Sequence, residues 1–379
     1  MVPPPPLLIQ IEPAIESAYD SHMATPRGRR EPIYPPTVLA RAAETQDSDG
    51  VPDRDPLAYG PVLRARFQEH LASFDERYGV DVRPVLAAAF LVNLLTEDNL
   101  PYYTHKNLDL AGSGEALVTW VHEWTAEEDA HGVLMRDYAL LTGLIADGGI
   151  IEHATYHAGR TRQLRAGTEI DPPGMAHALA YLTLQELLTK EAHNALSWLL
   201  DSSGRSVMRP ISGDEHNHFG FYLALSTAAL QADPDATLVA MDQVYAEFSM
   251  PGRAGIPDFD QLATTVGLAG IFDPVAVARS MQRIVERLDV AGAAPATDAG
   301  RAAQASVVER TSERTVARKQ SVMERLRARA ASSPAVAPAP DGLRPFLLGV
   351  TIDFEYAQTV TGPRIIDLRA VPETAGVTG

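Results

Sequence analysis

The sequence predicts an all-α protein built around a four-helix bundle, and two observations support this prediction. A Glu-x-x-His motif occurs twice in segments of helical character, and residues three apart share one face of a helix. Each motif follows, by about thirty residues, a single glutamate on an otherwise apolar helical segment. Bundles that hold two carboxylate-bridged metal ions use the same pattern. The six residues are Glu97, Glu128, His131, Glu186, Glu215 and His218.

The composition narrows the kind of site that the chain can form. Its 379 residues are 45% hydrophobic, which suffices for a large core, and none is cysteine. Disulfides, thiolate metal sites and cysteine nucleophiles are therefore excluded. A metal must be held by His, Asp, Glu or backbone oxygen, which favours iron or manganese. The net charge of −17 argues against nucleic acid as the main partner.

Neither a membrane span nor a secretory signal is expected. No apolar run approaches the length needed to cross a bilayer. The chain begins Met1-Val2-Pro3-Pro4-Pro5-Pro6, with no basic region ahead of an apolar one. We therefore expect a cytoplasmic protein.

Residues 1–60 are expected to form an N-terminal arm and an irregular segment. The opening prolines cannot lie in the interior of a helix. Leu7 to His22 is a candidate short helix, interrupted early by Pro13. Pro26 to Asp55 is rich in Pro, Arg and Asp, so we expect it to be irregular.

Residues 61–290 are expected to form the helical domain that carries the two motifs. Hydrophobic periodicity predicts an amphipathic helix over Pro61–Tyr78. Arg83 to about Leu100 is apolar nearly all round, which predicts a buried helix that ends or kinks at Pro101. The same reasoning, with N-caps at Ser113 and Asp273, predicts helices over Ser113–Leu144, Gly148–Gly167, Pro172–Leu200, Val207–Leu230, Asp235–Met250 and Asp273–Leu288.

Residues 291–379 are expected to be a linker, an Arg-rich helix and an extension that packs on the helical domain. Ala291–Gly300 is mostly Ala, Gly, Pro and Thr, which is typical of a linker. Arg301–Ala330 is helical in character and has an excess of basic residues. Apolar residues alternate in Pro345–Tyr356, which predicts a strand, and Ile365–Leu368 is a candidate second strand.

The two motifs have a simpler explanation, since Glu-x-x-His pairs also occur by chance on solvated helices. A lone Glu97 at a helix end would likewise ordinarily meet water. Against this, both motifs lie in apolar segments, with Trp124 before the first and Phe219 directly after the second. Burying a bare carboxylate costs several kcal/mol unless it is paired or binds a metal. Four buried carboxylates would also repel one another, so we interpret the six residues as ligands of two metal ions.

Other positions support weaker interpretations. Asp214 precedes Glu215 directly, and it can hydrogen-bond the ring nitrogen of His131 that faces away from the metal. Thr189, one turn after Glu186, can present its hydroxyl to the metal pocket or bond to its own helix carbonyl, and both alternatives stay open. We expect a group of histidines at the surface and two tryptophans in the core, namely His153, His157, His193 and His216, and Trp120 and Trp124.

With these residues in place, the chain resembles the soluble acyl-acyl-carrier-protein desaturases, which are ferritin-like di-iron enzymes of plant plastids and actinobacteria. The resemblance covers about Pro61 to Phe354, and the Trp-Thr-Ala-Glu-Glu block is specific to this family among ferritin-like proteins. The matching segments are Thr96–Tyr103, Trp124–Gly132, Gln185–Glu186 with Thr189, Asp214–His218 with Tyr222, and Ser249–Pro251, and more loosely the Arg-rich helix and Pro345–Phe346.

The resemblance implies a set of roles. The six Glu and His residues would bind two iron ions, with Glu128 and Glu215 bridging them. Thr189 matches a threonine beside the oxygen-binding pocket, and Asp214 matches a residue on the electron route. The implied enzyme is a homodimer that uses O2 and electrons from ferredoxin. It would introduce a double bond into an acyl chain on acyl carrier protein, in lipid biosynthesis.

The chain also departs from the family pattern. Members carry an upstream tryptophan that links the surface to Asp214, but here the segment reads Pro32-Ile33-Tyr34-Pro35. The relay is therefore missing, or Tyr34 replaces it. His216 and Asn217 stand where the family has basic residues. These changes leave the electron donor and the substrate open.

Two other classes of function compete with desaturation. One is a di-iron oxygenase that hydroxylates or N-oxygenates a carrier-bound biosynthetic intermediate, because it would use the same ligands. The other is iron storage or carrier binding without catalysis. Ferritin subunits are much shorter than this chain, and a silent binding protein would tolerate loss of ligands, whereas all six are present here. The sequence therefore favours an enzyme.

Overall fold

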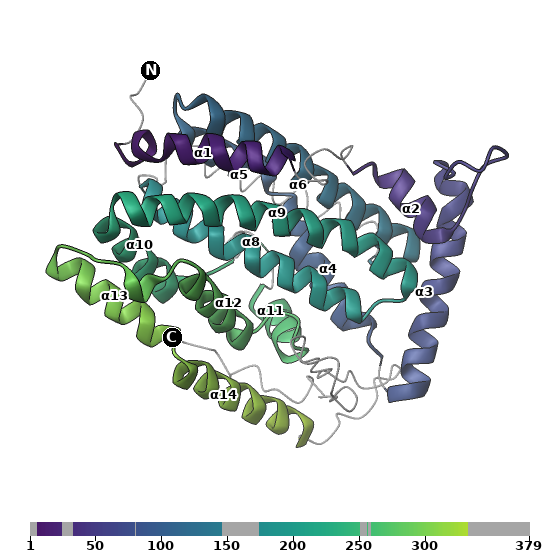
Figure 1. Ribbon diagram of the computed structural model, residues 1–379. Helices are drawn as coiled ribbons and strands as arrows, with labels where there is room; N and C mark the ends of the chain where they lie inside the picture. The colour runs from purple at the N-terminus through teal and green to yellow at the C-terminus, as the bar shows by residue number, and fades with distance from the viewer. Residues whose placement is uncertain are drawn as a thin grey trace.

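The computed structural model describes residues 6–24, 33–79, 81–145, 174–250, 256 and 259–332. In these residues the regular structure is helical apart from one isolated bridge between Gln46 and Pro52, which confirms the predicted all-α class (Figure 1). The helices are α1 (Pro6–Ala24), α2 (Pro35–Ala43), α3 (Pro56–Tyr78), α4 (Arg83–Glu97), α5 (Leu100–Ala111), α6 (Glu115–Thr142), α8 (Met175–Trp198), α9 (Ser202–Ala232), α10 (Pro234–Glu247), α11 (Phe259–Leu268), α12 (Pro274–Arg287), α13 (Asp298–Arg310) and α14 (Glu313–Ser332), with a 3-10 turn at Val290–Gly292.

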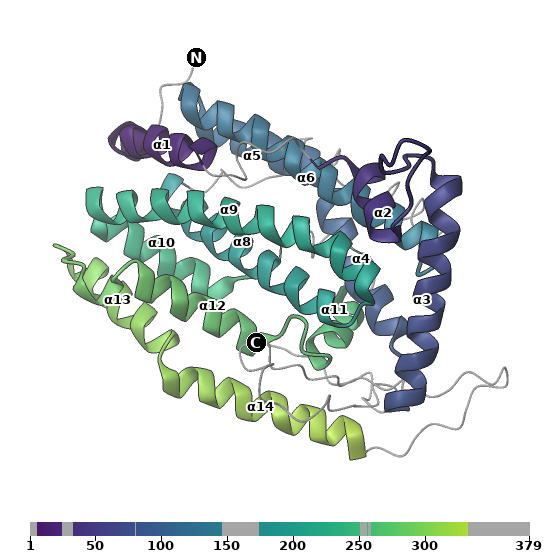
Figure 2. The same cartoon turned by 45° about the vertical axis from the view of Figure 1, so that its right-hand side comes forward.

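Two helix pairs form the centre of the molecule. Helices α8 and α9 run side by side along their length, and α4 packs against α6 (Figures 1 and 2). Helix α6 also contacts α9, which joins the two pairs into one bundle. Leu86 and Phe90 of α4 and Leu184 and Leu188 of α8 are fully buried, and burial of such side chains is the main favourable term in folding. The predicted four-helix core is therefore confirmed.

The other helices cover the bundle. Helix α1 lies against α9 and α6 and buries Leu8, Ile11 and Ile15. Helices α2 and α3 pack together at one end of the bundle, while α10 and α12 both pack against α8 (Figure 2). Helix α13 packs on α10, and α14 packs on α12. The buried core that α8, α10 and α12 share extends to Ala303 and Val307 of α13.

Part of the N-terminal prediction is wrong. The segment expected to be irregular contains α2, whose first turn carries two prolines, a position where proline is tolerated. Leu39 and Ala40 are fully buried, and α2 contacts α3 and α9. Tertiary packing therefore stabilises a helix that composition alone does not indicate. The short helices α5 and α11 were not predicted either.

Several predicted helix ends lie close to those observed, although α3 and α9 each begin five residues earlier than predicted. Helix α4 ends at Glu97, and a new helix begins three residues later with Pro101 in its first turn. The N-cap of α6 is Gly114 rather than Ser113. The predicted cap at Asp273 is confirmed, because its side chain accepts hydrogen bonds from the first turn of α12 at 2.8 Å. The Arg-rich segment forms two helices that separate at Thr311.

Three predicted elements lie outside the described residues, namely the helix Gly148–Gly167 and the strands Pro345–Tyr356 and Ile365–Leu368. Within the described part of the chain, no helix combines the length and the apolar character that crossing a bilayer would require.

The close approach of α9 to α6 gives a stability test at Gly204. A Cβ atom there would lie 2.6 Å from the Tyr138 hydroxyl and 2.7 Å from Leu200 Cβ. Gly204→Ala should therefore lower the free energy of unfolding by about 1–3 kcal/mol, measured by urea denaturation. Gly220→Ala on the same helix would meet nothing within 4 Å and should be neutral or stabilising by up to about 1 kcal/mol. Equal effects of the two changes would contradict this packing.

Candidate metal centre

The bundle brings all six predicted ligands into one buried cluster. Glu97 stands in the last turn of α4, and Glu186 lies in the middle of α8. Helices α6 and α9 each contribute one Glu-x-x-His motif. None of the six exposes more than 8% of its surface. The alternative in which these residues lie on solvated helix surfaces is therefore wrong.

Each glutamate of the two motifs faces both motif histidines. Glu128 places Oε2 3.2 Å from His131 Nδ1 and Oε1 3.1 Å from His218 Nδ1. Glu215 places Oε1 3.5 Å from His131 Nδ1 and Oε2 3.8 Å from His218 Nδ1. Two carboxylates with one oxygen on each side of the cluster have the arrangement needed to bridge two ions.

The two remaining glutamates lie on opposite sides of this pair. Glu186 Oε2 is 3.5 Å from His218 Nδ1, and it forms a group of four possible donors with that histidine, Glu128 and Glu215. Glu97 belongs to a second group that also includes Glu215. In both groups the donor atoms lie within 4.8 Å of one another. The cluster therefore offers two adjacent positions for cations.

The outer nitrogens of the motif histidines are held by acidic residues in a reciprocal way. His131 Nε2 of α6 lies 3.3 Å from Asp214 Oδ2 of α9, which is the contact predicted from the sequence. His218 Nε2 of α9 lies 2.7 Å from Glu127 Oε2 of α6. A carboxylate accepts, so Nε2 donates in each case and Nδ1 is left to face the cluster.

Sequence reasoning missed Glu127, although the signal was present. Asp214 directly precedes the glutamate of the second motif, and Glu127 holds the same place in the first motif. Because the two motif helices pack against each other, the equivalent position on each helix reaches the histidine of the other. A comparison of the two motifs would have identified this pair.

Burial and the neighbouring charges give the carboxyl groups of the cluster different pKa values. Burial raises the pKa of Glu97 well above its usual value, and the charges of Glu128 and Glu215 raise it further. Burial also raises the pKa of Glu186 well above its usual value. Burial acts in the same direction on Glu128 and Glu215, but the nearby imidazoles outweigh it and hold the pKa values of both carboxyl groups below the usual range.

The motif histidines respond in the opposite direction. Burial alone would lower the pKa of His131, but hydrogen bonds to Asp214 and Glu128, together with the nearby Glu215 carboxylate, raise it well above its usual value. The pKa of His218 is raised in the same way, with Glu127 as the largest opposing contact. Protonated imidazoles therefore compensate part of the carboxylate charge. Bound cations would displace these protons and supply more positive charge.

Several polar atoms of the cluster have no hydrogen-bond partner among the described residues. They include both carboxylate oxygens of Glu186, both of Glu215 and Nδ1 of His218. Leaving such groups unpaired in the interior costs about 1–3 kcal/mol each, and more when they are charged. Carboxylate oxygens and imidazole nitrogens without thiolate suit iron or manganese. The residues present therefore fit a pair of such ions.

The two alternatives for Thr189 are resolved in favour of the bond to its own helix. Thr189 is buried, and its hydroxyl donates to the Gln185 carbonyl at 2.8 Å. The same oxygen accepts from Gln185 Nε2 at 2.9 Å. A catalytic role for Thr189 remains a prediction.

The expectation that His193 lies at the surface is wrong, because this histidine is fully buried beside the cluster. His216 is exposed as predicted, whereas His153 and His157 lie outside the described residues. The two tryptophans expected in the core are buried. Trp120 stacks on Phe221 with ring centroids 3.8 Å apart.

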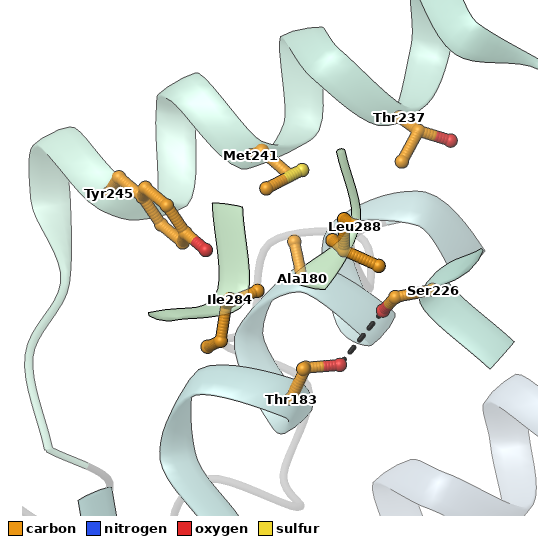
Figure 3. Close-up of a pocket in the computed structure, with 8 residues that line it drawn as sticks. All are labelled: Ala180, Thr183, Ser226, Thr237, Met241, Tyr245, Ile284 and Leu288. Carbon is orange, nitrogen blue, oxygen red and sulfur yellow. Dashed lines mark hydrogen bonds between the residues drawn. The ribbon is translucent and has the colours of Figure 1, made fainter. Parts of the chain in front are cut away.

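A small cavity lies between α8, α9, α10 and the end of α12 (Figure 3). It has room for about one water molecule, so it is too small for an acyl chain. Thr183 and Ser226 share a hydrogen bond of 2.8 Å on its wall. The hydroxyls of Thr237 and Tyr245, which also line this cavity, have no partner among the described residues.

Known proteins resemble this chain. A sequence model described as fatty acid desaturase matches residues 43–337. DesA1 of Mycobacterium tuberculosis, named as a proposed acyl-[acyl-carrier-protein] desaturase, is 30% identical over 222 residues, which cover 55% of this chain and 64% of that protein. Acyl-[acyl-carrier-protein] desaturase 6 of rice (Oryza sativa subsp. japonica), chloroplastic, is 31% identical over 220 residues, which cover 54% of this chain and 50% of that protein. The match thus spans between half and two thirds of these relatives.

A solved structure also matches. It is that of DesA2 from Mycobacterium tuberculosis H37Rv, also named as a proposed acyl-ACP desaturase. The sequence identity is 18% and the TM-score is 0.49, over 76% of this chain and 96% of that chain.

Removal of either motif histidine should reduce metal binding. We expect the purified protein to hold about two irons per chain. His131→Ala and His218→Ala should each hold fewer, because each removes one donor and leaves a carboxylate without its neighbour. Iron analysis after gel filtration measures this. His122→Ala, at an exposed position of α6, should keep the full amount. Full iron in both His131→Ala and His218→Ala would show that the ligand assignment is wrong.

Proposed function

The chain belongs to the fatty acid desaturase family, and from this premise we propose that it is an O2-dependent acyl-[acyl-carrier-protein] desaturase. In this proposal it removes two hydrogens from an acyl chain on acyl carrier protein and takes electrons from ferredoxin. The observation that carries the proposal is the buried cluster in which Glu128 and Glu215 each face both motif histidines. The names of the similar mycobacterial and rice proteins support the substrate class.

The residues of the cluster have distinct tasks in this proposal. Glu128 and Glu215 would bridge two iron ions, and Glu97 with His131, and Glu186 with His218, would complete the two positions. Iron held in this way supplies the oxidising power for breaking C–H bonds with O2. The protein contributes a buried site, fixed ligands and a position for the chain beside it.

The acidic residues behind the histidines fix the orientation of both rings. Asp214 and Glu127 hold the Nε2 atoms of His131 and His218, so that Nδ1 points into the cluster. Such outer contacts typically contribute 10–100-fold in metal affinity or activity. The Asp214 side chain is 18% exposed, so it connects the buried cluster to the surface. This placement supports the proposed role of Asp214 in the electron route.

Tyr34 is the candidate outer member of that route. It is 53% exposed, and the Arg54 guanidinium lies 5.0 Å from the centre of its ring. An exposed aromatic ring held by a cation is accessible to a docked protein. We include Tyr34 in the proposal as the residue that takes the place of the missing upstream tryptophan.

The reaction product tests the proposed function. With ferredoxin, its reductase, NADPH and long-chain acyl carrier protein, mass spectrometry should show a product lighter by two hydrogen atoms and without oxygen from 18O2. His218→Ala serves as the metal-depleted control and should give no product.

Other products would contradict desaturation in different ways. A product that gains one labelled oxygen atom would favour the oxygenase. No product from several chain lengths, with iron still bound, would indicate another substrate class or a blocked electron route. A chemical reductant separates the last two cases, because it restores turnover only when electron delivery through Tyr34 and Asp214 is at fault.

Acyl carrier proteins are acidic, so docking on an acidic protein needs a local basic surface. We propose that it lies on α14. Arg314 and Arg327 of this helix are already paired with Glu309 and Asp273 at 2.6 and 2.7 Å, and Arg310 at the end of α13 is paired with Asp242 at 3.0 Å. Arg318 is exposed and Lys319 half-buried, and neither forms an ion pair with another described residue. These two basic residues are therefore available to a partner.

Charge reversal tests this surface. Arg318→Glu with Lys319→Glu should weaken binding of acyl carrier protein by about tenfold or more and reduce its dependence on salt, measured by calorimetry at two ionic strengths. Arg205→Glu with Arg209→Glu makes the same change of charge at exposed positions of α9 and should have a smaller effect. Unchanged affinity in the α14 variant would show that the docking surface is not on α14, and the sequence offers Arg160, Arg162 and Arg165, which lie outside the described residues, as the next basic group to test.

A further inference from the structure

His193 is a buried histidine that the proposed ligand set does not use. It lies on α8, two turns after Glu186 and on the same face of the helix. Its side chain is fully buried, and neither ring nitrogen has a hydrogen-bond partner among the described residues. Burying an imidazole without a partner is costly, so nearly all buried polar groups in proteins are paired. The ring therefore lacks a partner that a bound group would supply.

The ring of His193 faces one side of the cluster. Its Nε2 atom lies 3.5 Å from Oε1 of Glu215, the same oxygen that lies 3.5 Å from His131 Nδ1. His193, Glu97 and Glu215 form a group whose possible donor atoms all lie within 4.8 Å of one another. His193 therefore belongs to the position that Glu97 and His131 occupy, and not to the side of Glu186 and His218.

The separation of these atoms distinguishes a shared ion from a hydrogen bond. A distance of 3.5 Å exceeds the usual 2.7–3.2 Å of an N–H···O bond. Two donors that each bind one ion at about 2.1 Å, with an angle of 90 to 110° between them, lie roughly 3–3.5 Å apart. The pairs His131–Glu215 and His218–Glu186 have the same 3.5 Å separation. The separation of His193 from Glu215 therefore equals the separation between pairs of the proposed ligands.

We propose that His193 is a seventh ligand, bound through Nε2 to the metal ion on the Glu97 side. This inference rests on the proposed function, because it requires the pair of metal ions. It makes the two positions chemically unequal, since one has two imidazoles and the other has one. A neutral imidazole adds a donor to that position without adding to the negative charge that burial already disfavours.

Pulsed EPR of the one-electron-reduced iron protein counts the imidazole nitrogens that bind the metal. Protein with 15N-labelled histidine should show three in the natural sequence and two in His193→Gln. His177→Gln, at a half-buried position of the same helix, should keep three. Iron should also leave His193→Gln faster on addition of a chelator, by about tenfold or more for one of its two ions.

The count in the natural sequence decides the inference without any variant. Two coordinated imidazoles together with two bound irons would overturn the seventh ligand and leave the proposed function intact. Absence of bound iron from the natural protein would overturn both. Three imidazoles in His193→Gln would show that the third nitrogen comes from another residue, which also overturns the inference.

Discussion

The structure depends on the repulsion among four buried carboxylates and on the way it is balanced. Glu97, Glu128, Glu186 and Glu215 lie in one cluster with almost no access to water. Without compensation such a cluster would be strongly destabilising, because burial and like charge both oppose ionisation. The motif histidines compensate part of the charge, and two metal ions would compensate more. Four buried carboxylates do not stabilise the fold, so their presence argues for a chemical use of the metal ions that they would bind.

The arrangement around the cluster is nearly symmetric, and its exceptions are informative. The pair α4 and α6 supplies one Glu and one motif, and the pair α8 and α9 supplies the same. Asp214 and Glu127 extend the symmetry, since each holds the histidine of the opposite motif. His193 breaks it, because α8 carries a second residue toward the cluster. A fold built from two similar halves can therefore present two unequal metal positions.

The sequence predicted what periodicity and spacing encode, which is the bundle, the six clustered residues and the contact of Asp214 with His131. It did not predict α2, because a Pro-rich composition hid a short helix that packing stabilises. It placed His193 at the surface, because a single histidine on a helix, taken alone, does not show which neighbour it contacts. Its spacing of seven residues from Glu186, which puts both on one face of the helix, was the signal that could have corrected this prediction. Glu127 required comparison of the two motifs, since its partner lies on another helix.

Iron K-edge X-ray absorption on the natural protein tests the central claim most directly, because it reports whether two irons occupy the same cluster. If Glu128 and Glu215 bridge two ions, the spectrum should show iron–iron scattering at roughly 3–4 Å and only oxygen and nitrogen as nearest neighbours. Stoichiometric iron without iron–iron scattering would contradict the paired centre. In that case the four buried carboxylates would bind separate ions.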